Sequence, residues 1–338
     1  MSGVRAAVLH RHGAAPQVEQ RPAPVGASGR VVVDVAAAPI TPLDVLCAGG
    51  SSYFGAPALP YVPGVQGVGT VRTADGLPSG TPVWFATSAG MAPGDGSLMT
   101  VVTVPETDVV PLEHDVPPTL VAALGLSAVA AERSLLGRGS LQAGETVVVL
   151  GAGGVVGQVA VQLALLHGAA RVVAGCRSDA AAARARRCGA AAVVRLDTDD
   201  VAVLSQRFVE ACAGAAHLVV DPLCGPPASA AVLALAEGGR LVNLGSSAGA
   251  TAVLDSATLR SRSLSVLGYT NNALSREQRR EALSAVVAHA ARGELTVDHE
   301  VVPLSEVAQA WTRQSQGHAD RRFVVDLTSA STPSQEAP

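Results

Sequence analysis

The chain has 338 residues, a formal net charge of −4, and a composition that is 48% hydrophobic but only 3% aromatic. That length suggests about two domains, and so apolar a chain can build a sizeable core from small and branched side chains without disulfides or metal ions. With a slightly acidic charge and no basic run longer than pairs such as Arg186-Arg187, the chain has little electrostatic attraction for nucleic acid.

The first part of the chain, to about residue 120, is predicted to form an all-β body. Short Val-rich runs alternate there with Pro and Gly, which is typical of strands joined by tight turns. The expected strands are Arg30–Ala36, Gly67–Arg72, Thr81–Phe85 and Met99–Pro105.

From about residue 118 onwards, strand-like and helix-like segments alternate. The expected strands are Glu145–Leu150, Arg171–Ala174, Ala192–Arg195, His217–Asp221 and Arg240–Leu244. The expected helices are Val155–His167, Ser178–Cys188, Asp199–Cys212 and Pro226–Ala236. This alternation indicates βαβ units, so we predict a parallel sheet with helices on both faces.

The last part of the chain is predicted to hold a long helix that begins near Ser275, because Ser275 and Gln278 form a capping-box pattern and Gly293 supplies a stop. A shorter helix, Ser305–Gln314, and a last strand, Arg322–Leu327, follow. Residues 328–338 are rich in Ser, Thr, Pro and Glu, and we expect them to be disordered.

We expect a cytoplasmic protein. Residues 1–9 contain an arginine and no apolar run of signal-peptide length, and Gly or charged residues interrupt the longest apolar stretches before the roughly 18 residues that a membrane span needs. The five cysteines are odd in number and widely scattered, which suits free thiols in a reducing compartment.

One segment predicts a phosphate-binding loop. An apolar strand runs into a glycine-rich turn and then into an amphipathic helix; the turn and helix start contain Gly151, Gly153, Gly154, Val155, Val156 and Gly157. Glycines permit a tight turn, close approach of the backbone to a pyrophosphate, and close packing of strand and helix. The helix start offers free N–H groups to phosphates. An ordinary tight turn is the alternative, but the βαβ context favours dinucleotide binding.

The end of the next strand predicts which nucleotide binds. NAD-binding sites usually place Asp or Glu there, to accept from the adenosine ribose 2′-hydroxyl. This chain has Arg177 and Ser178 instead, a cation and a hydroxyl that suit a 2′-phosphate, so NADPH is favoured. The alternative is a solvated Arg177 followed by a helix-capping Ser178.

With these residues identified, the chain resembles the medium-chain dehydrogenase/reductase superfamily and, within it, the zinc-free quinone oxidoreductases. The resemblance covers nearly all of residues 3–327. It rests on the segments 36–44, 59–69, 125–128, 151–157, 221–225, 238–245 and 263–269. It implies an α/β fold with a GroES-like β-rich catalytic domain (1–120 and 269–327) and a Rossmann doubly wound parallel-sheet domain (121–268) inserted between its two parts.

The resemblance also implies that no metal is held. Thr41, Val65 and about Leu124 stand where zinc alcohol dehydrogenases of this superfamily carry their ligands, and Gln66 stands where a Glu is usual. Aliphatic side chains have no donor atoms and Thr is a poor zinc ligand. Without a Lewis acid, simple alcohol oxidation loses its main catalytic device. Hydride transfer to a quinone or a conjugated enone needs less help, because the charge delocalises onto oxygen.

Two residues are candidates for catalysis. Tyr53 lies near a position where enoyl reductase relatives have a tyrosine facing the substrate, and Thr41 could hydrogen-bond the substrate or the nicotinamide ribose. The alternatives are a loop aromatic on the rim for Tyr53 and a turn residue before Pro42 for Thr41. Asp44 is interpreted as a structural hydrogen-bond acceptor rather than a base.

Further cofactor-binding candidates follow from the resemblance and from the carboxyl edge of the sheet, where ligands bind in this architecture. They are Ser127, Gly245, Ser246, Tyr269 and Thr270, with Asn271 beside them. The strand 263–269 resembles the edge through which relatives pair their sheets, so we expect a homodimer.

Three interpretations of function stay open at this point. The first is an NADPH-dependent reductase of quinones or enones, acting on a small-molecule substrate with no nucleic-acid or membrane partner. The second is an enoyl-thioester or polyketide-tailoring enoyl reductase. The third is a protein that binds NADPH with little or no catalysis.

Overall fold

The computed structural model describes residues 3–328, which divide into two compact units. Unit 1 comprises the chain up to Gly125 and from Asp298 onwards, and unit 2 runs from Leu126 to Val297. Residues 269–297 thus belong to unit 2, although the sequence pattern placed the return to the first domain at residue 269. The proposed disordered tail lies outside the described residues, apart from its first residue.

Unit 1 is built around the long strand β3 (Arg30–Pro39), which has three antiparallel neighbours. They are β4 (Gln66–Thr73), β6 (Val101–Pro105) and β15 (Arg322–Asp326). Within the described residues the sheet has seven strands and also contains β5 (Pro82–Ala86), β7 (Val109–Pro111) and β14 (His299–Pro303). Strands β1 (Val4–Val8) and β2 (Gln17–Arg21) form a separate antiparallel pair. The predicted β-rich domain is confirmed.

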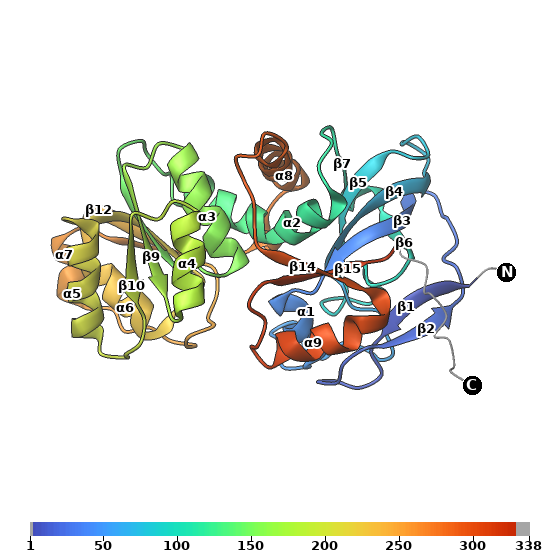
Figure 1. The fold of residues 1–338 in the computed structure, drawn as a ribbon, viewed down its shortest axis with the longest axis horizontal. Coiled ribbons are helices and arrows are strands. Elements are labelled where there is room, and N and C mark those ends of the chain that lie inside the picture. The colour runs from blue at the N-terminus through green and yellow to red at the C-terminus, as the bar shows by residue number, and fades with distance from the viewer. Residues whose placement is uncertain (1–2, 329–338) are drawn as a thin grey trace. The chain divides into compact units, whose positions relative to one another are not determined.

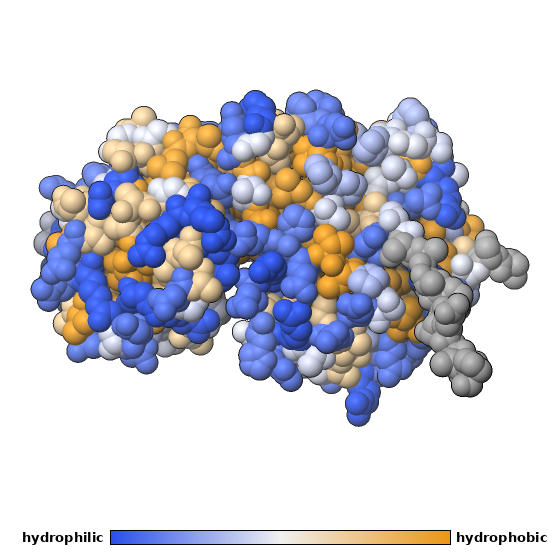
Figure 2. Space-filling view, in the orientation of Figure 1, coloured by the Kyte–Doolittle hydropathy of each residue, from blue (hydrophilic) through white to orange (hydrophobic). Residues whose placement is uncertain are grey.

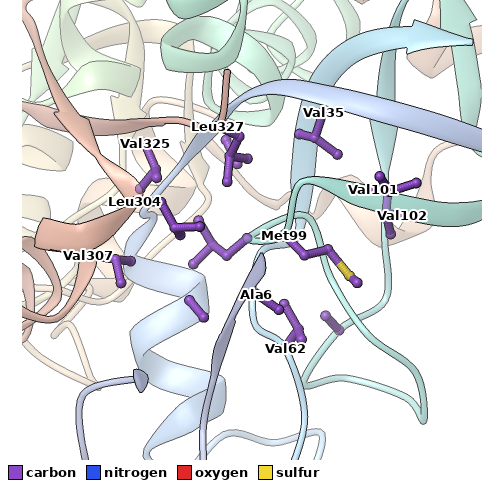
Figure 3. Close-up of a cluster of buried hydrophobic side chains, with 14 of the residues drawn as sticks. Ala6, Val35, Val62, Met99, Val101, Val102, Leu304, Val307, Val325 and Leu327 are labelled. Carbon is purple, nitrogen blue, oxygen red and sulfur yellow. The ribbon is translucent and has the colours of Figure 1, made fainter. Parts of the chain in front are cut away.

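The core of unit 1 combines side chains from both ends of the chain. Figure 3 shows Ala6 and Val62 near Met99, with Leu304 and Val325 close by. Most of this core consists of valine, alanine and leucine, as the composition predicted. The C-terminal segment is therefore part of the first domain because its apolar residues complete that core.

Two helices of unit 1 contact each other, α1 (Pro42–Ala48) and α9 (Val307–Ser315). Short 3-10 turns occur at Glu106–Asp108 and Leu304–Glu306. Helix α1 begins after Thr41, whose side chain accepts from the backbone N–H of Asp44 and completes a capping box. The sequence pattern did not predict α1 because Pro42 was interpreted as strand punctuation. Proline is nevertheless well suited to the first position of a helix.

The helix α2 (Pro118–Glu132) has a kink at Gly125, where φ is 31° and ψ is −132°. A Cβ at Gly125 would lie 2.0 Å from Oε1 of Gln66, so only glycine fits there. A π-helical turn, Arg133–Arg138, follows. The combined run Pro118–Arg138 is long and apolar enough for a membrane span, which the sequence analysis did not anticipate. However, 67% of its most apolar window is buried inside the structure, as expected for a core helix.

Among residues 3–328, six strands form the sheet of unit 2, and all of them are parallel. In spatial order they are β10 (Ala192–Arg195), β9 (Arg171–Cys176), β8 (Thr146–Leu150), β11 (Ala216–Asp221), β12 (Leu235–Asn243) and β13 (Ser265–Gly268). Numbered from β8, this is the order 3-2-1-4-5-6 of the dinucleotide-binding fold. The predicted doubly wound sheet is confirmed.

The helices of unit 2 pack in two groups (Figure 1). Helix α3 (Val155–Leu166) lies beside α4 (Asp179–Arg187), and α5 (Val201–Cys212) lies beside α6 (Gly225–Leu233). Because the strand order reverses between β8 and β11, the loops that follow these two strands diverge at a switch point, where this fold binds ligands. The remaining elements are α7 (Ser256–Ser261), a 3-10 turn (Asn271–Ala273) and α8 (Arg276–Ala291).

The end of unit 2 is tied to α3 by side-chain hydrogen bonds. The amide of Gln162 donates to the carbonyl of Thr296 at 2.8 Å and accepts from its N–H at 3.1 Å. Helix α8 begins with the capping box predicted for Ser275 and Gln278. These contacts are the physical reason that residues 269–297 belong with the parallel sheet.

Candidate cofactor-binding site

The glycine loop between β8 and α3 has the close packing that a phosphate-binding turn requires. Gly151 has a φ of +61°, a conformation that disfavours other residues. A Cβ at Gly157 would lie 2.4 Å from the Cα of Ala152, and one at Gly153 would lie 2.3 Å from the Cβ of Ala181. By contrast, a Cβ at Gly154 would have only an ordinary contact, 3.4 Å from the carbonyl oxygen of Gly151. Protein packing therefore requires two of these glycines but leaves space at Gly154.

Two side chains hold this loop in place through one carbonyl group. The oxygen of Gly153 accepts from Nε2 of Gln158 and from Nε of Arg184, both at 3.0 Å. Gln158 belongs to α3 and Arg184 to α4, so both helices are fixed to the loop. Gly154 is the N-cap of α3, whose first residues are Val155 and Val156. The backbone N–H groups of the first helical turn are donors suited to a pyrophosphate.

The predicted 2′-phosphate residues lie where β9 ends and α4 begins. Arg177 is exposed, and Ser178 is the N-cap of α4, with its Oγ accepting from the N–H of Ala181 at 3.2 Å. The capping role considered for Ser178 is thus present, and its hydroxyl proton is still available to an anion. Figure 2 shows strongly hydrophilic residues on the surface over α4.

Beyond the switch point, a buried carboxylate organises the loops after β11 and β12. Asp221 accepts from the N–H groups of Leu223 and Cys224 and from Nδ2 of Asn243, at 2.8 to 2.9 Å. Burial raises the pKa of Asp221, while these hydrogen bonds lower it. Asn243 also donates to the carbonyl of Gly245 at 2.9 Å, so the position of Gly245 is fixed. Ser246 follows directly in the same loop.

The candidates after β13 lie next to the start of the second half of α2. The hydroxyl of Tyr269 donates to Oδ1 of Asn271 at 2.6 Å, and Nδ2 of Asn271 donates to the carbonyl of Leu126 at 3.0 Å. The structure thereby brings Tyr269 close to the residue preceding Ser127. Thr270 caps the 3-10 turn by accepting from Asn272. Burial raises the pKa of Tyr269, which stays protonated.

In unit 1, Thr41 is committed to a local network. Its hydroxyl donates to Oδ2 of Asp44 at 2.5 Å and accepts from the N–H of Asp44 at 3.2 Å. Oδ1 of Asp44 accepts from the N–H of Val65 at 2.9 Å. Burial raises the pKa of Asp44, while these bonds and the charge of Arg322 lower it. The Thr41 hydroxyl proton is thus already bonded, and the arrangement supports the structural interpretation of Asp44.

Tyr53 lies on the loop after α1 and is 81% exposed. Its ring contacts that of Phe54, with centroids 4.1 Å apart. The fold places Tyr53 and Thr41 on either side of α1 but shows no contact between them within the described residues. Sequence reasoning also missed two cations at the nucleotide end of unit 2, Arg184 and Arg195. Arg195 ends the predicted strand Ala192–Arg195, and consecutive strands of βαβ units are usually neighbours in the sheet, which is the signal that could have identified it.

Comparison with known proteins places this architecture among dehydrogenases. Residues 155–288 match a family model described as zinc-binding dehydrogenase. A probable oxidoreductase from Mycobacterium abscessus is 26% identical, with a TM-score of 0.82 over 96% of this chain and 100% of that one. An NAD-dependent alcohol dehydrogenase is 25% identical, with a TM-score of 0.83 over 95% and 99% of the two chains. A mycobacterial quinone oxidoreductase is 20% identical, with a TM-score of 0.85 over 96% and 99%. No curated protein matches the sequence.

The zinc in that family description does not fit the side chains of this chain. Val65 and Leu124 are buried and aliphatic, and the Thr41 hydroxyl is bonded to Asp44. The amide of Gln66 accepts from Nε1 of Trp84 at 3.1 Å. Across residues 3–328, no group of three or more His, Cys, Asp or Glu side chains is arranged to hold a metal ion. A tetrahedral zinc site needs nitrogen or sulfur donors that these positions lack.

Proposed function

The chain belongs to the medium-chain dehydrogenase/reductase superfamily, and from this premise we propose that it is a zinc-independent, NADPH-dependent oxidoreductase that reduces a quinone or an enone. The observation that carries the proposal is the glycine loop at the switch point of a 3-2-1-4-5-6 parallel sheet. That loop supports a dinucleotide at this site because its packing brings backbone donors to the edge of the sheet.

The choice of NADPH is supported by the residues of this chain. One of the similar structures is described as NAD-dependent, so overall likeness does not decide between the two nucleotides. The end of β9 has Arg177 and Ser178 in place of the acidic side chain that accepts from a ribose hydroxyl. A carboxylate does follow at Asp179, but it is fully exposed and paired with Arg195.

The residues that would hold the cofactor form a series along the carboxyl edge of the sheet. Arg177 and Ser178 would bind the adenosine end, and the loop Gly151–Gly157 would bind the pyrophosphate. The residues beyond the switch point, Ser127, Gly245, Ser246, Tyr269 and Thr270, would border the nicotinamide half. When bound, the reduced nicotinamide supplies a hydride.

The class of hydride acceptor is proposed from the absence of zinc donors at the expected positions. Since no zinc donors are present at the expected positions, an alkoxide would have no Lewis acid to stabilise it. A quinone or a conjugated enone accepts hydride and carries the charge on its oxygen, where a hydroxyl or water can deliver a proton. Tyr53 is the candidate donor in unit 1, because its side chain is exposed and a phenolic hydroxyl can donate a hydrogen bond.

Two other functions are supported by specific observations. An enoyl-thioester or polyketide-tailoring enoyl reductase would use the same constellation, and Tyr53, 81% exposed on its loop, is accessible to an acyl thioester. A catalytically weak NADPH-binding protein is favoured by the commitment of the Thr41 hydroxyl to Asp44. We propose small-molecule substrates, no nucleic-acid or membrane partner, and a cytoplasmic homodimer. The edge strand β13, with Val266 44% exposed, supports the dimer.

The test is a rate measurement with NADPH and three classes of acceptor: a simple quinone, an enone and an acyl thioester. We expect steady NADPH oxidation with a quinone or enone, and its loss in Gly157→Val. A marked preference for the acyl thioester would support the second function. NADPH binding without turnover on any acceptor would support the third, and no binding of either nucleotide would refute all three.

A further inference from the structure

Three arginines of unit 2 lie near the carboxyl end of β9. Arg177 follows β9, Arg184 lies on α4, and Arg195 is the last residue of β10. The sheet brings Arg195 beside Arg177 because Arg195 is in register with Cys176 on the neighbouring strand. One guanidinium nitrogen of Arg195, Nη2, donates to the carbonyl of Arg177 at 2.9 Å.

Arg195 already has one acidic partner at the surface. The other terminal nitrogen of Arg195, Nη1, is paired with Oδ1 of Asp179, the first residue of α4. The Asp179 side chain is fully exposed, and that of Arg195 is 36% exposed. The charge of Arg195 also acts on Asp197, whose carboxylate is paired with Arg207 at 2.6 Å. Positive charge reaches the end of β9: burial raises the pKa of Cys176, while a hydrogen bond from Gly153 and the charges of Arg184, Arg195 and Arg186 lower it.

We infer that Arg195 is a second specificity-determining cation for the adenosine 2′-phosphate, and that Asp179 is its counter-ion until the phosphate replaces it. This inference rests on the proposed NADPH function. An arginine has five N–H donors, and within the described residues only two are used by the contacts with Asp179 and Arg177. A 2′-phosphate carries close to two negative charges, so it is a stronger partner than one solvated carboxylate.

The geometry explains why Asp179 does not make this an NAD site. An acidic residue that selects NAD must accept from the ribose hydroxyl, and Asp179 is instead paired with Arg195 across the loop. Because this ion pair is at the surface, separating it costs little. Asp179 would therefore weaken NADPH binding slightly without creating a site for NADH.

The experiment measures binding of adenosine 2′,5′-bisphosphate and of 5′-AMP by calorimetry, so that no turnover is needed. The variants are Arg195→Ala, Arg195→Lys, Asp179→Asn and the double variant Arg195→Ala with Asp179→Asn. Arg260→Ala, an exposed arginine on α7, is the control for a general loss of charge. Arg195→Ala could also disturb the loop, so Arg195→Lys is included because it keeps the positive charge. Thermal unfolding of each variant measures any such disturbance.

For Arg195→Ala we expect affinity for the bisphosphate to fall about tenfold or more, with 5′-AMP affinity unchanged. Arg195→Lys should recover part of this loss, and Arg260→Ala should show none. Asp179→Asn should raise bisphosphate affinity about two- to fivefold, but only when Arg195 is present.

Two results would overturn the inference: equal bisphosphate affinity in wild type and Arg195→Ala, or the same gain from Asp179→Asn with and without Arg195. In either case NADPH would still bind to the wild-type protein, so the proposed function would stand. A wild-type protein that binds neither NADPH nor NADH would refute the proposed function itself.

Discussion

Gly153 and Ala181 are so close that a Cβ added to the glycine would lie 2.3 Å from that of the alanine. The glycine loop therefore rests directly on the first turn of α4, which follows Arg177 and Ser178, the residues proposed for the adenosine end. If the proposed function is right, pyrophosphate binding and the choice of nucleotide both depend on this close contact between loop and helix.

The glycines of the loop should separate ligand binding from protein packing. We expect Gly154→Val to abolish NADPH binding while lowering stability by only about 1 kcal/mol, because the protein leaves space at that position. Gly157→Val should lose NADPH binding and also about 1–3 kcal/mol of stability, because its side chain would meet the backbone of Ala152. Thermal unfolding and nicotinamide fluorescence titration measure the two effects. Unchanged NADPH affinity in both variants would contradict the proposed site.

Arg177 should control cofactor preference. Charge-assisted hydrogen bonds contribute on the order of 1.5–3 kcal/mol each, so NADPH should bind roughly tenfold to a hundredfold more tightly than NADH. We expect Arg177→Ala to remove most of this preference by weakening NADPH binding alone, and added salt to weaken NADPH binding more in wild type than in the variant. Titration of both nucleotides against both proteins is the measurement. A variant that loses both nucleotides equally would show that Arg177 is a solvated residue at the helix start.

Metal removal should leave the protein unaffected. Val65 and Leu124 offer no donor atoms, and the Thr41 hydroxyl is bonded to Asp44. We expect elemental analysis of the purified protein to find no stoichiometric zinc, and chelators to leave NADPH oxidation unchanged. One tightly bound zinc per chain would contradict the assignment of these positions.

The pair Glu145–Arg240 should give unit 2 an acid-sensitive stability. Both side chains are at least 85% buried and form two hydrogen bonds, at 2.6 and 2.7 Å. Burial alone would raise the pKa of Glu145. The hydrogen bonds from Arg240 and from the Gln142 N–H outweigh burial, so the pKa in the folded protein lies below the usual 4.5. A lowered folded pKa means that the pair stabilises the protein above about pH 4.5 and loses this effect as pH falls through the folded pKa.

We expect Glu145→Gln to cost about 2 kcal/mol or more at pH 7, because Arg240 is left without its counter-ion. The difference from wild type should shrink as pH falls below about 4.5 and be smallest below the lowered folded pKa of Glu145, where the carboxylate is protonated in both the folded and the unfolded state. Urea unfolding at several pH values measures it. Asp34→Asn, in the solvent-exposed pair with Arg72, is the control and should have little effect. A constant difference between Glu145→Gln and wild type across this range would exclude the pair as its source.

Local sequence signals predicted most elements of unit 2. Ala192–Arg195 was predicted and observed with the same limits, because a β-branched run between glycine and a polar loop has one simple interpretation. Strand β12 begins five residues earlier than predicted, at Leu235, because Gly238 and Gly239 lie inside it and have the composition of a turn. The π-helical turn Arg133–Arg138 has no local signature that periodicity could reveal.

The candidate site shows the same division between local and distant information. The glycine loop and the cap at Ser178 follow from neighbouring residues, so the sequence predicted both. Arg195 approaches Arg177 only through the pairing of two strands, and Asp44 reaches the N–H of Val65 across 21 residues of chain. Contacts between segments distant in sequence depend on register, which composition alone does not encode.

The two tryptophans of the chain, Trp84 and Trp311, are both buried in unit 1. Intrinsic indole emission therefore reports on the β-rich unit alone, while the parallel-sheet unit contributes helices to the far-ultraviolet dichroism signal. Comparing the two spectroscopic transitions in one denaturation series would show whether the units unfold together or in sequence. Because both tryptophans lie in unit 1, intrinsic fluorescence can follow the unfolding of that unit without an added label.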